Sequence, residues 1–512
     1  MTEAPASDAM PRPLLQRVQR LFVILLLGFA SGLPLALTGG AMQAWLTVDG
    51  LDLVTMGFLS LIGIPYTFKF LWAPLIDRFD LPLLGRRRGW IVVLLAALGA
   101  ALMLMSGLSP ARSLAMFASV AVLVACLSAT LDVVIDAYRT DLLEPNERGL
   151  GGSLTVLGYR LAMVLSGGIA LIWAEQWQSW PKVYGVMAMI CFGAAVLALL
   201  LMPALPERFR GPQSRAGGEL RGFLALIAGV ALGAWLAHQA LVLAGMDPDS
   251  GNRWVRLGFV LTQIAAAMVL GLGVTRWVRF ETLNASMRSY FGMRGAWAFL
   301  ALVVLYKVGD AFALSLSTPF LLKGVGFTQS EVGLANKTIG LLMTIVGAIV
   351  GGFFLLRVRL STALLAFGAL QLVSNLGFYA LAREGIGAWG SLTLPEFNLL
   401  VVHLDEPTDI DRLLLFAISL DNFAGGMGTA AFVALLSGLC GSRFSATHYA
   451  LLSAFATLGR VFVGPFAGVF ADAWGWQAFF LLSVVVGLPG LAMAWWLRRQ
   501  VDATVETPAR PE

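Results

Sequence analysis

Residues 127–141 read LSATLDVVIDAYRTD and place two carboxylates, Asp132 and Asp136, at the end of a long apolar run. A charge near the centre of a bilayer costs about 2.5–3.5 kcal/mol on insertion scales, so acidic residues in a spanning helix usually face a bundle interior or an aqueous path. The spacing of four places both carboxyls on one face of a helix. If that face lines a cavity, burial and mutual repulsion favour the protonated form of at least one of them, as a proton-carrying site requires.

The rest of the composition predicts a protein with many membrane-spanning helices. Of the 512 residues, 58% are hydrophobic and 13% are charged, which leaves too few polar side chains to coat a soluble globule of this size. Cys126, Cys191 and Cys440 lie in or beside apolar runs without paired spacing. The sequence therefore predicts neither a disulfide framework nor a metal site, and it suggests no cofactor.

Basic and acidic residues alternate between the apolar runs. Arginines cluster at 12–20, 78–88, 139–148, 208–221, 276–294, 357–359 and 498–499. The intervening loops carry aspartates such as Asp49, Asp247 and Asp405. Because positive residues concentrate on the cytoplasmic side, we expect both termini in the cytoplasm and an even number of spans. A nucleic-acid surface at residues 86–88 is the alternative, but topology explains these arginines better, so no nucleic-acid partner is expected.

Apolar stretches of about 20 residues predict fourteen helices, at 21–46, 54–76, 90–108, 113–137, 151–174, 182–203, 222–245, 254–276, 296–322, 331–355, 361–381, 411–437, 448–471 and 475–497. Polar stretches bracket the seventh and eighth helices and leave six on each side. The predicted organisation is a cytoplasmic tail at 1–20, an N-terminal six-helix bundle at 21–203, a linker at 204–295 carrying two additional helices, a C-terminal six-helix bundle at 296–498 and a cytoplasmic tail at 499–512.

The two predicted bundles share a pattern in the same order. Gly50 to Gly57 in the first matches Gly326 to Gly333 in the second, with flanking apolar residues in register. Arg160 and Arg460 each lie in a fifth helix, and each is followed eight residues later by a glycine, Gly168 or Gly468. This order indicates two homologous halves, as in the major facilitator superfamily.

Charged residues inside the second bundle are candidates for proton coupling together with Asp132 and Asp136. Lys307 and Asp310 are three residues apart and can pair on one helical face, either to fix packing or to open and close during function. Asp421 and Asn422, followed by a glycine-rich segment, occupy the place equivalent to Asp132 and Asp136. Two-fold related helices would direct both sets at one central cavity, so Asp310 and Asp421 are further proton-coupling candidates.

Other polar side chains in the predicted helices could bind a polar or anionic substrate. Lys69 could extend toward the cytoplasm or bind an anionic group. Arg160 and Arg460 are better anion candidates, since a guanidinium can hold a carboxylate bidentately. Further hydrogen-bonding candidates are Gln43, Asn336, Lys337 and Asn422. No catalytic triad, cysteine pair or phosphate-binding loop is recognisable, so the chain is not expected to be an enzyme.

The segment after the second predicted helix combines an acid with a basic turn. Its charged residues, which could form a gating latch between the halves that pairs in one state and releases in another, are Asp77, Arg78, Arg86, Arg87 and Arg88. The alternative is that they only fix topology.

Several strings together resemble the AmpG-type muropeptide permeases: DVVIDAY (132–138), LGYR (157–160), LYKVGDAF (305–312), GVGF (324–327), NKT (336–338), GGMGT (425–429) and FSAT (444–447). The resemblance covers both bundles but not the two middle helices or the loop around 382–410. Leu131 departs from the family, which often has Gln there, and Asp421 stands where Glu is common.

The resemblance implies a major facilitator fold and a bacterial inner-membrane importer of N-acetylglucosaminyl-1,6-anhydro-N-acetylmuramic acid, with or without a stem peptide. We expect the protein to function as a monomer. The resemblance also implies proton coupling, with muropeptide, protons and lipid as partners, and a role in wall recycling and β-lactamase induction. Such a ligand would suit Tyr66, Tyr159 and Tyr306 as ring-stacking residues, and Arg160 or Lys307 for its carboxylate. The alternatives are a proton-coupled sugar or drug exporter, an acetyl-CoA carrier, a membrane-embedded acyltransferase or glycan hydrolase, and a muropeptide receptor that does not transport.

Overall fold

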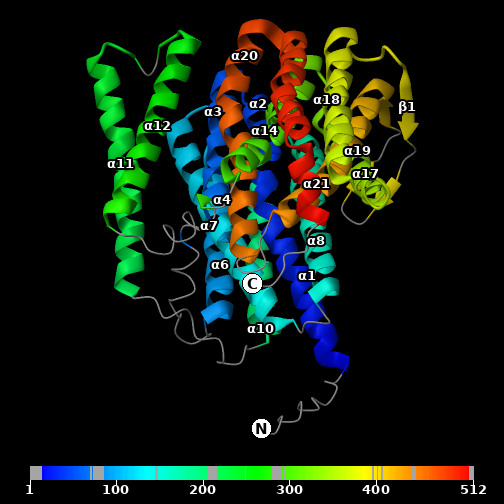
Figure 1. Ribbon diagram of the computed structural model, residues 1–512. Helices are drawn as coiled ribbons and strands as arrows, with labels where there is room; N and C mark the ends of the chain where they lie inside the picture. The colour runs from blue at the N-terminus through cyan, green and yellow to red at the C-terminus, as the bar shows by residue number, and fades with distance from the viewer. Residues whose placement is uncertain are drawn as a thin grey trace.

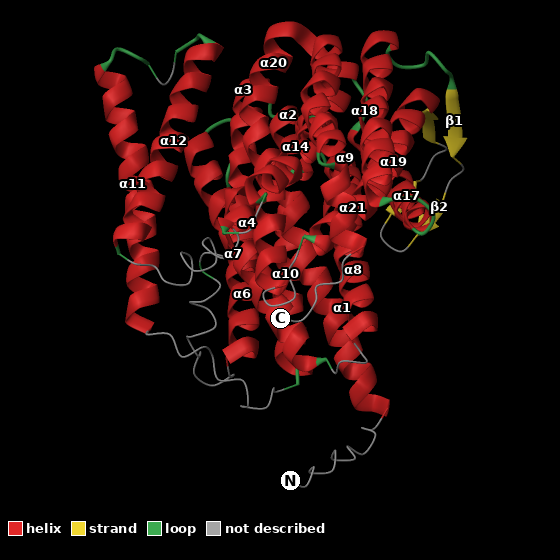
Figure 2. Cartoon of the chain, viewed as in Figure 1, coloured by secondary structure: helices red, strands yellow, loops and turns green. Residues whose placement is uncertain are grey.

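A computed structural model describes residues 14–69, 72, 86–143, 148–203, 216–247, 250–278, 291–292, 295–394, 397–399, 402–404, 408–439 and 445–506. Long helices run side by side and make up nearly all of this part of the chain (Figures 1 and 2). This confirms the prediction of a helical membrane protein. Below, the first bundle means the helices within 14–203 and the second bundle means those within 295–506.

The first bundle opens with two helices separated by a short break and continues through a helix interrupted at residues 60–63. Its helices are α1 (Leu14–Leu37), α2 (Gly40–Val48), α3 (Leu53–Leu59), α4 (Ile64–Phe68), α6 (Arg86–Ser106), α7 (Leu114–Leu142), α8 (Arg148–Val164), α9 (Ala170–Trp177) and α10 (Trp180–Leu201). A π-helical turn at Leu165–Ile169 joins α8 to α9. Helix α1 packs on α7 and α8, while α6 packs on α7 and α10.

The two middle helices, α11 (Ala216–Leu243) and α12 (Arg253–Trp277), form a hairpin beside the bundles (Figure 1). In their most apolar windows only 22% and 17% of residues are buried, against 33–56% in the other candidate spans. Most of their surface is therefore available to lipid, and they pack chiefly against each other.

The second bundle repeats the broken-helix pattern. Its helices are α14 (Ala296–Ser315), α15 (Ser317–Pro319), α16 (Gln329–Leu334), α17 (Gly340–Leu355), α18 (Leu360–Glu384), α19 (Arg412–Gly438), α20 (Ser445–Trp496) and α21 (Arg498–Glu506). π-Helical turns lie at Phe320–Val325 and Ala335–Ile339. Gly475, at φ 74°, breaks α20, so this helix spans both the thirteenth and the fourteenth predicted ranges.

Eleven helices in the described ranges are long and apolar enough to cross a membrane. Two shorter apolar helices, Leu53–Phe68 and Gly340–Leu355, lie in the predicted ranges 54–76 and 331–355. The count of fourteen and the side of the termini stay predictions.

Short strands were not predicted in the loop around 382–410. There β1 (Ser391–Leu394) pairs antiparallel with β4 (Thr408–Asp411), and β2 (Phe397–Leu399) pairs antiparallel with β3 (Val402–Leu404). The carboxylate of Asp411 anchors this loop because it accepts hydrogen bonds from the backbone N–H groups of Gly387 at 2.7 Å and Leu414 at 2.8 Å.

The bundles touch along two seams built from the glycines of the repeat. At the seam between α3 and α20, a Cβ on Gly57 would lie 3.0 Å from the Cα of Gly468. At the seam around α16, a Cβ on Gly333 would lie 2.8 Å from the carbonyl oxygen of Gly168. Residues without a Cβ let helix backbones approach this closely. The matched glycines therefore meet in reciprocal pairs.

Candidate functional site

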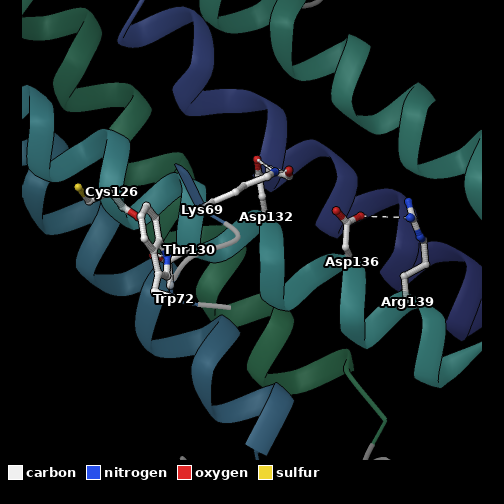
Figure 3. Close-up of polar contacts among 8 residues, drawn as sticks. Lys69, Trp72, Cys126, Thr130, Asp132, Asp136 and Arg139 are labelled. Carbon is white, nitrogen blue, oxygen red and sulfur yellow. Dashed lines mark hydrogen bonds and ion pairs between the residues drawn. The ribbon is translucent and has the colours of Figure 1, made fainter. Parts of the chain in front are cut away.

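Asp132 lies at the centre of a polar cluster formed by three elements of the first bundle. Its Oδ2 is 3.2 Å from Nζ of Lys69, which directly follows α4. Its Oδ1 accepts a hydrogen bond from the hydroxyl of Ser31 on α1. Only 15% of the Asp132 side chain is exposed, against 33% of Lys69. Figure 3 shows Lys69 reaching across to Asp132 on α7. Burial of a charged carboxylate requires such a partner.

Asp136 has a different environment although it follows Asp132 by one helical turn. Its Oδ1 lies 3.1 Å from the guanidinium of Arg139, and 59% of its side chain is exposed. In Figure 3 the two aspartates have separate partners. The two carboxylates therefore offer one buried and one accessible charge along the same helix.

Aromatic residues and hydroxyls surround the Asp132 cluster. Trp72 donates its indole N–H to the hydroxyl of Thr130 at 3.0 Å (Figure 3). This hydrogen bond links the segment after α4 to helix α7. The buried hydroxyl of Tyr66 lies near Asp132 and Tyr159. Tyr159 and Arg160 on α8 are both partly exposed. Aromatic rings, hydroxyl groups and charges of both signs therefore lie close together around Asp132.

The second bundle contains a polar cluster of its own. Nζ of Lys307 lies 3.7 Å from Oδ2 of Asp310, so the predicted contact is confirmed. Asp421 on α19 is only 5% exposed and interacts electrostatically with Lys307 and Asp310. Its Oδ1 accepts a hydrogen bond of 3.4 Å from Ser374 on α18. Three helices thus converge on two acids and one lysine.

Three predicted substrate ligands form contacts between helices in this conformation. Gln43 donates to the carbonyl of Ser315 at 2.7 Å. Tyr306 donates to the carbonyl of Leu364 at 3.0 Å. The amide oxygen of Asn422 accepts from Thr344 at 3.0 Å, while its NH₂ donates to Ile418.

The described part of the predicted latch bonds within its own bundle. Nε of Arg87 lies 3.4 Å from Oδ2 of Asp141 at the end of α7, and the guanidinium of Arg88 donates to the carbonyl of Leu199. Of the other predicted latch residues, Asp77, Arg78 and the side chain of Arg86 lie outside the described residues, as do the side chains of the predicted substrate ligands Lys337 and Arg460. Asn336 lies in the π-helical turn Ala335–Ile339.

Hydrogen bonds between the bundles reinforce the glycine seams. Oε2 of Glu175, in α9, accepts from the backbone N–H of Ser330 at 2.6 Å and so caps α16 across the interface. Ser60 donates to the carbonyl of Val461 at 3.2 Å. The bundles are therefore joined at the end that carries the acidic loops.

Sequence reasoning missed several members of these clusters. Ser31 and Ser374, which bond to the buried aspartates, have no spacing relation to them in sequence. Gln371 and Asn375 are buried in α18 beside Ser374. Gln371 and Asn375 are four residues apart in sequence, so the sequence alone could have indicated a polar stripe on one face of this helix. Within the described residues, no group of histidine, cysteine and acidic side chains is placed to hold a metal ion.

This chain is similar in sequence to one family model and to several known transport proteins. The model of the Major Facilitator Superfamily matches residues 24–394. The anhydromuropeptide permease of Escherichia coli is 40% identical over 94% of this chain and 80% of its own length. The putative transporter AmpG 4 of Rickettsia conorii is 26% identical over 94% of this chain and 97% of its own.

Two solved structures share the fold at low identity. A POT family transporter in complex with a thioalcohol-conjugated peptide has a TM-score of 0.66 and 13% identity, covering 94% of this chain and 96% of the other. The E. coli xylose transporter XylE in an inward-open conformation has a TM-score of 0.57 and 13% identity, covering 94% and 95%. At this identity the likeness concerns the fold alone.

Proposed function

Because the chain belongs to the Major Facilitator Superfamily, and within it to the family of the E. coli anhydromuropeptide permease, we propose that it imports anhydromuropeptides from periplasm to cytoplasm. The substrate is N-acetylglucosaminyl-1,6-anhydro-N-acetylmuramic acid with or without a stem peptide. The identity of 40% over 94% of the chain is the observation that carries this assignment. The imported fragments would serve wall recycling and β-lactamase induction.

The protein is a multi-pass transporter of the bacterial inner membrane. Its chemistry is binding and translocation, and we assign it no enzymatic step. It works as a monomer, with a substrate path between the bundles. The seams α3–α20 and α9–α16 close this path at the predicted periplasmic end, so the conformation fits a state that faces the cytoplasm.

Proton coupling is assigned to the pair of Asp132 and Lys69. With Asp132 ionised, the pair satisfies both charges at 3.2 Å. Protonation removes the negative charge and leaves the ammonium of Lys69 without its partner. Lys69 then binds a carboxylate of the muropeptide, because an unpaired buried charge is costly. Substrate and proton therefore favour the same loaded state.

The other charged residues take supporting roles in this scheme. Asp136 is the accessible carboxylate that passes protons between Asp132 and the aqueous path. Asp310, Lys307 and Asp421 form a second protonatable cluster, which responds as the bundles rearrange. Arg160 is available for a second carboxylate of the stem peptide, and Tyr66 and Tyr159 for sugar ring faces.

The assignment is tested by uptake of radiolabelled N-acetylglucosaminyl-anhydromuramyl-tripeptide into proteoliposomes, with and without an acid-outside pH gradient. We expect accumulation that a protonophore collapses. An absence of uptake by folded, correctly oriented protein would overturn the importer assignment.

The alternatives differ in what the labelled muropeptide does in proteoliposomes or in detergent. An exporter would move substrate in the opposite direction, and a receptor would bind the muropeptide without accumulating it. An acyltransferase or glycan hydrolase would convert the substrate to product in detergent.

A further inference from the structure

Helix α12 contacts both bundles through two arginines in its first turn. Nη1 of Arg253 lies 2.6 Å from Oδ2 of Asp472 on α20, an electrostatic contact rather than a directed hydrogen bond. Nη2 of Arg256 donates to the hydroxyl of Thr55 on α3 at 3.2 Å. Residues three apart share a helical face. One face of α12 thus binds the second bundle through Arg253 and the first bundle through Arg256.

The contact of Arg256 belongs to a short hydrogen-bonded chain. The hydroxyl of Thr55 accepts from Arg256 and donates to Oδ2 of Asp52 at 2.6 Å. Oδ1 of Asp52 caps α3 by accepting from the backbone N–H of Thr55 at 2.9 Å. The guanidinium also lies 5.7 Å from the centre of the Phe58 ring, within range of a cation–π interaction. Arg256 is therefore bound to the start of α3 by several groups.

A small apolar cluster accompanies these polar contacts, with one buried residue from each of three helices. Val54 of α3, Leu257 of α12 and Val469 of α20 are 3%, 6% and 0% exposed. Trp254 packs edge-on against Phe470, with ring centroids 5.5 Å apart. Helix α12 therefore packs on α3 and α20 together.

The place where α12 docks is the seam between the bundles. A Cβ on Gly57 would lie 2.5 Å from the carbonyl oxygen of Gly464, so α3 and α20 are in backbone contact. The end of α11, the start of α12 and the turn within α20 lie at the same end of the molecule in Figure 1. Opening the path at this end would separate α3 from α20, and α12 could follow only one of them.

We propose that Arg253 and Arg256 form a clamp across the α3–α20 seam, and that the two middle helices stabilise the conformation closed at the periplasmic end. The arginines are positioning residues for transport, since neither lies in the substrate path. Each opening breaks at least one of the two contacts and each closing restores it. This inference rests on the alternating-access part of the proposed function.

The test measures the opening of this end directly, without substrate or gradient. Spin labels are placed at Val48 of the first bundle and Ile386 of the second, which are 55% and 54% exposed, after Cys126, Cys191 and Cys440 are replaced by alanine. Double electron–electron resonance measures the distribution of distances between the two labels. The labelled protein that keeps both arginines is compared with the labelled double variant Arg253→Gln/Arg256→Gln. The control is Arg276→Gln, at the opposite end of α12.

We expect the double variant to increase the population with the longer distance at least threefold, each single variant to increase it less, and the control to leave it unchanged. The exchange Arg253→Asp with Asp472→Arg should restore the short distance, which also excludes a general folding defect. An unchanged distribution in a monodisperse double variant would overturn the clamp. Uptake assayed separately in proteoliposomes tests the importer assignment, because a failed clamp leaves proton-driven accumulation intact.

Discussion

Nζ of Lys69 and Oδ2 of Asp132 lie 3.2 Å apart, although 63 residues separate them in sequence. Asp132 is the more buried of the two, and the hydroxyl of Ser31 holds its other oxygen. A buried ion pair is sensitive to the loss of either partner, because the remaining charge is left without compensation.

Replacing Asp132 by Asn should lower gradient-driven accumulation at least tenfold, since the variant cannot bind and release the coupled proton. Counterflow exchange of labelled for unlabelled muropeptide should persist, because exchange needs no net proton movement. Both are measured in proteoliposomes. Asp247→Asn, in the loop after α11, is the control and should behave like the unaltered protein. Normal accumulation by Asp132→Asn would refute the assignment.

Replacing Asp136 by Asn should have a smaller effect, with accumulation reduced about two- to fivefold. Its side chain is 59% exposed and its partner Arg139 is three residues away, an arrangement worth about 0.2–0.5 kcal/mol in isolated helices. Initial uptake rates across a series of external pH values measure the effect. A loss as large as that of Asp132→Asn would instead show that coupling needs Asp136 as much as Asp132.

Replacing Asp421 by Glu should preserve uptake, whereas replacing it by Asn should reduce it at least fivefold. Glutamate keeps the carboxylate beside Lys307 and Asp310, while asparagine leaves Lys307 with Asp310 alone. Uptake and thermal stability are measured on both variants. Equal activity of the Asn variant would remove this residue from the coupling scheme.

Replacing Gly57 by Ala should disturb the α3–α20 seam, since the added methyl would lie 2.5 Å from the carbonyl oxygen of Gly464. Overpacking of this kind costs about 1–3 kcal/mol, so the melting temperature in detergent should fall by several degrees and uptake should fall with it. Gly258→Ala in α12 is the matched control, because a Cβ there meets nothing within 4 Å. Equal melting temperatures for the two variants would contradict the close contact.

The pH dependence of the clamp follows from Asp52, which lies outside the spanning helices. Burial acts to raise its pKa, but the hydrogen bonds from Thr55 and the charge of Arg256 outweigh burial, so the pKa of Asp52 lies below its usual value. A lowered pKa stabilises the folded protein above the unfolded value of about 3.9, and this contribution is lost as the pH falls through the lower folded value.

The difference in melting temperature between the unaltered protein and Asp52→Asn should therefore stay constant from pH 8 to pH 5. It should shrink only below about pH 4. Thermal unfolding in detergent across this range measures the difference. Convergence of the two proteins between pH 7 and pH 5 would contradict the assigned role of Asp52.

The helices and the contact of Lys307 with Asp310 could be predicted because they depend on nearby residues. Apolar runs define the spans, and a spacing of three brings two side chains to one helical face. The glycines of the repeat could be matched because each half keeps the same spacing around them. In the structure these glycines meet at the seams.

The partners of the buried charges could not be predicted because they come from distant helices. Nothing local to Lys69 indicates Asp132, and nothing local to Arg253 indicates Asp472. Spacing placed Asp132 and Asp136 on one helix face, but their exposure depends on which neighbours cover each turn. The strands between residues 391 and 411 were missed because they are only three or four residues long, too short for an alternating pattern to be recognised.

The clamp also bears on the order in which the chain is assembled. Arg253 precedes Asp472 by roughly 220 residues, so at about 5–20 residues per second the ribosome delivers the second partner some 10–45 s after the first. Thr55 has by then already been made. Helix α12 can dock on α3 while α20 is still unsynthesised, and it then presents Arg253 and Leu257 to the arriving helix. The hairpin of α11 and α12 would thus guide the late second bundle to its place beside the first during biogenesis.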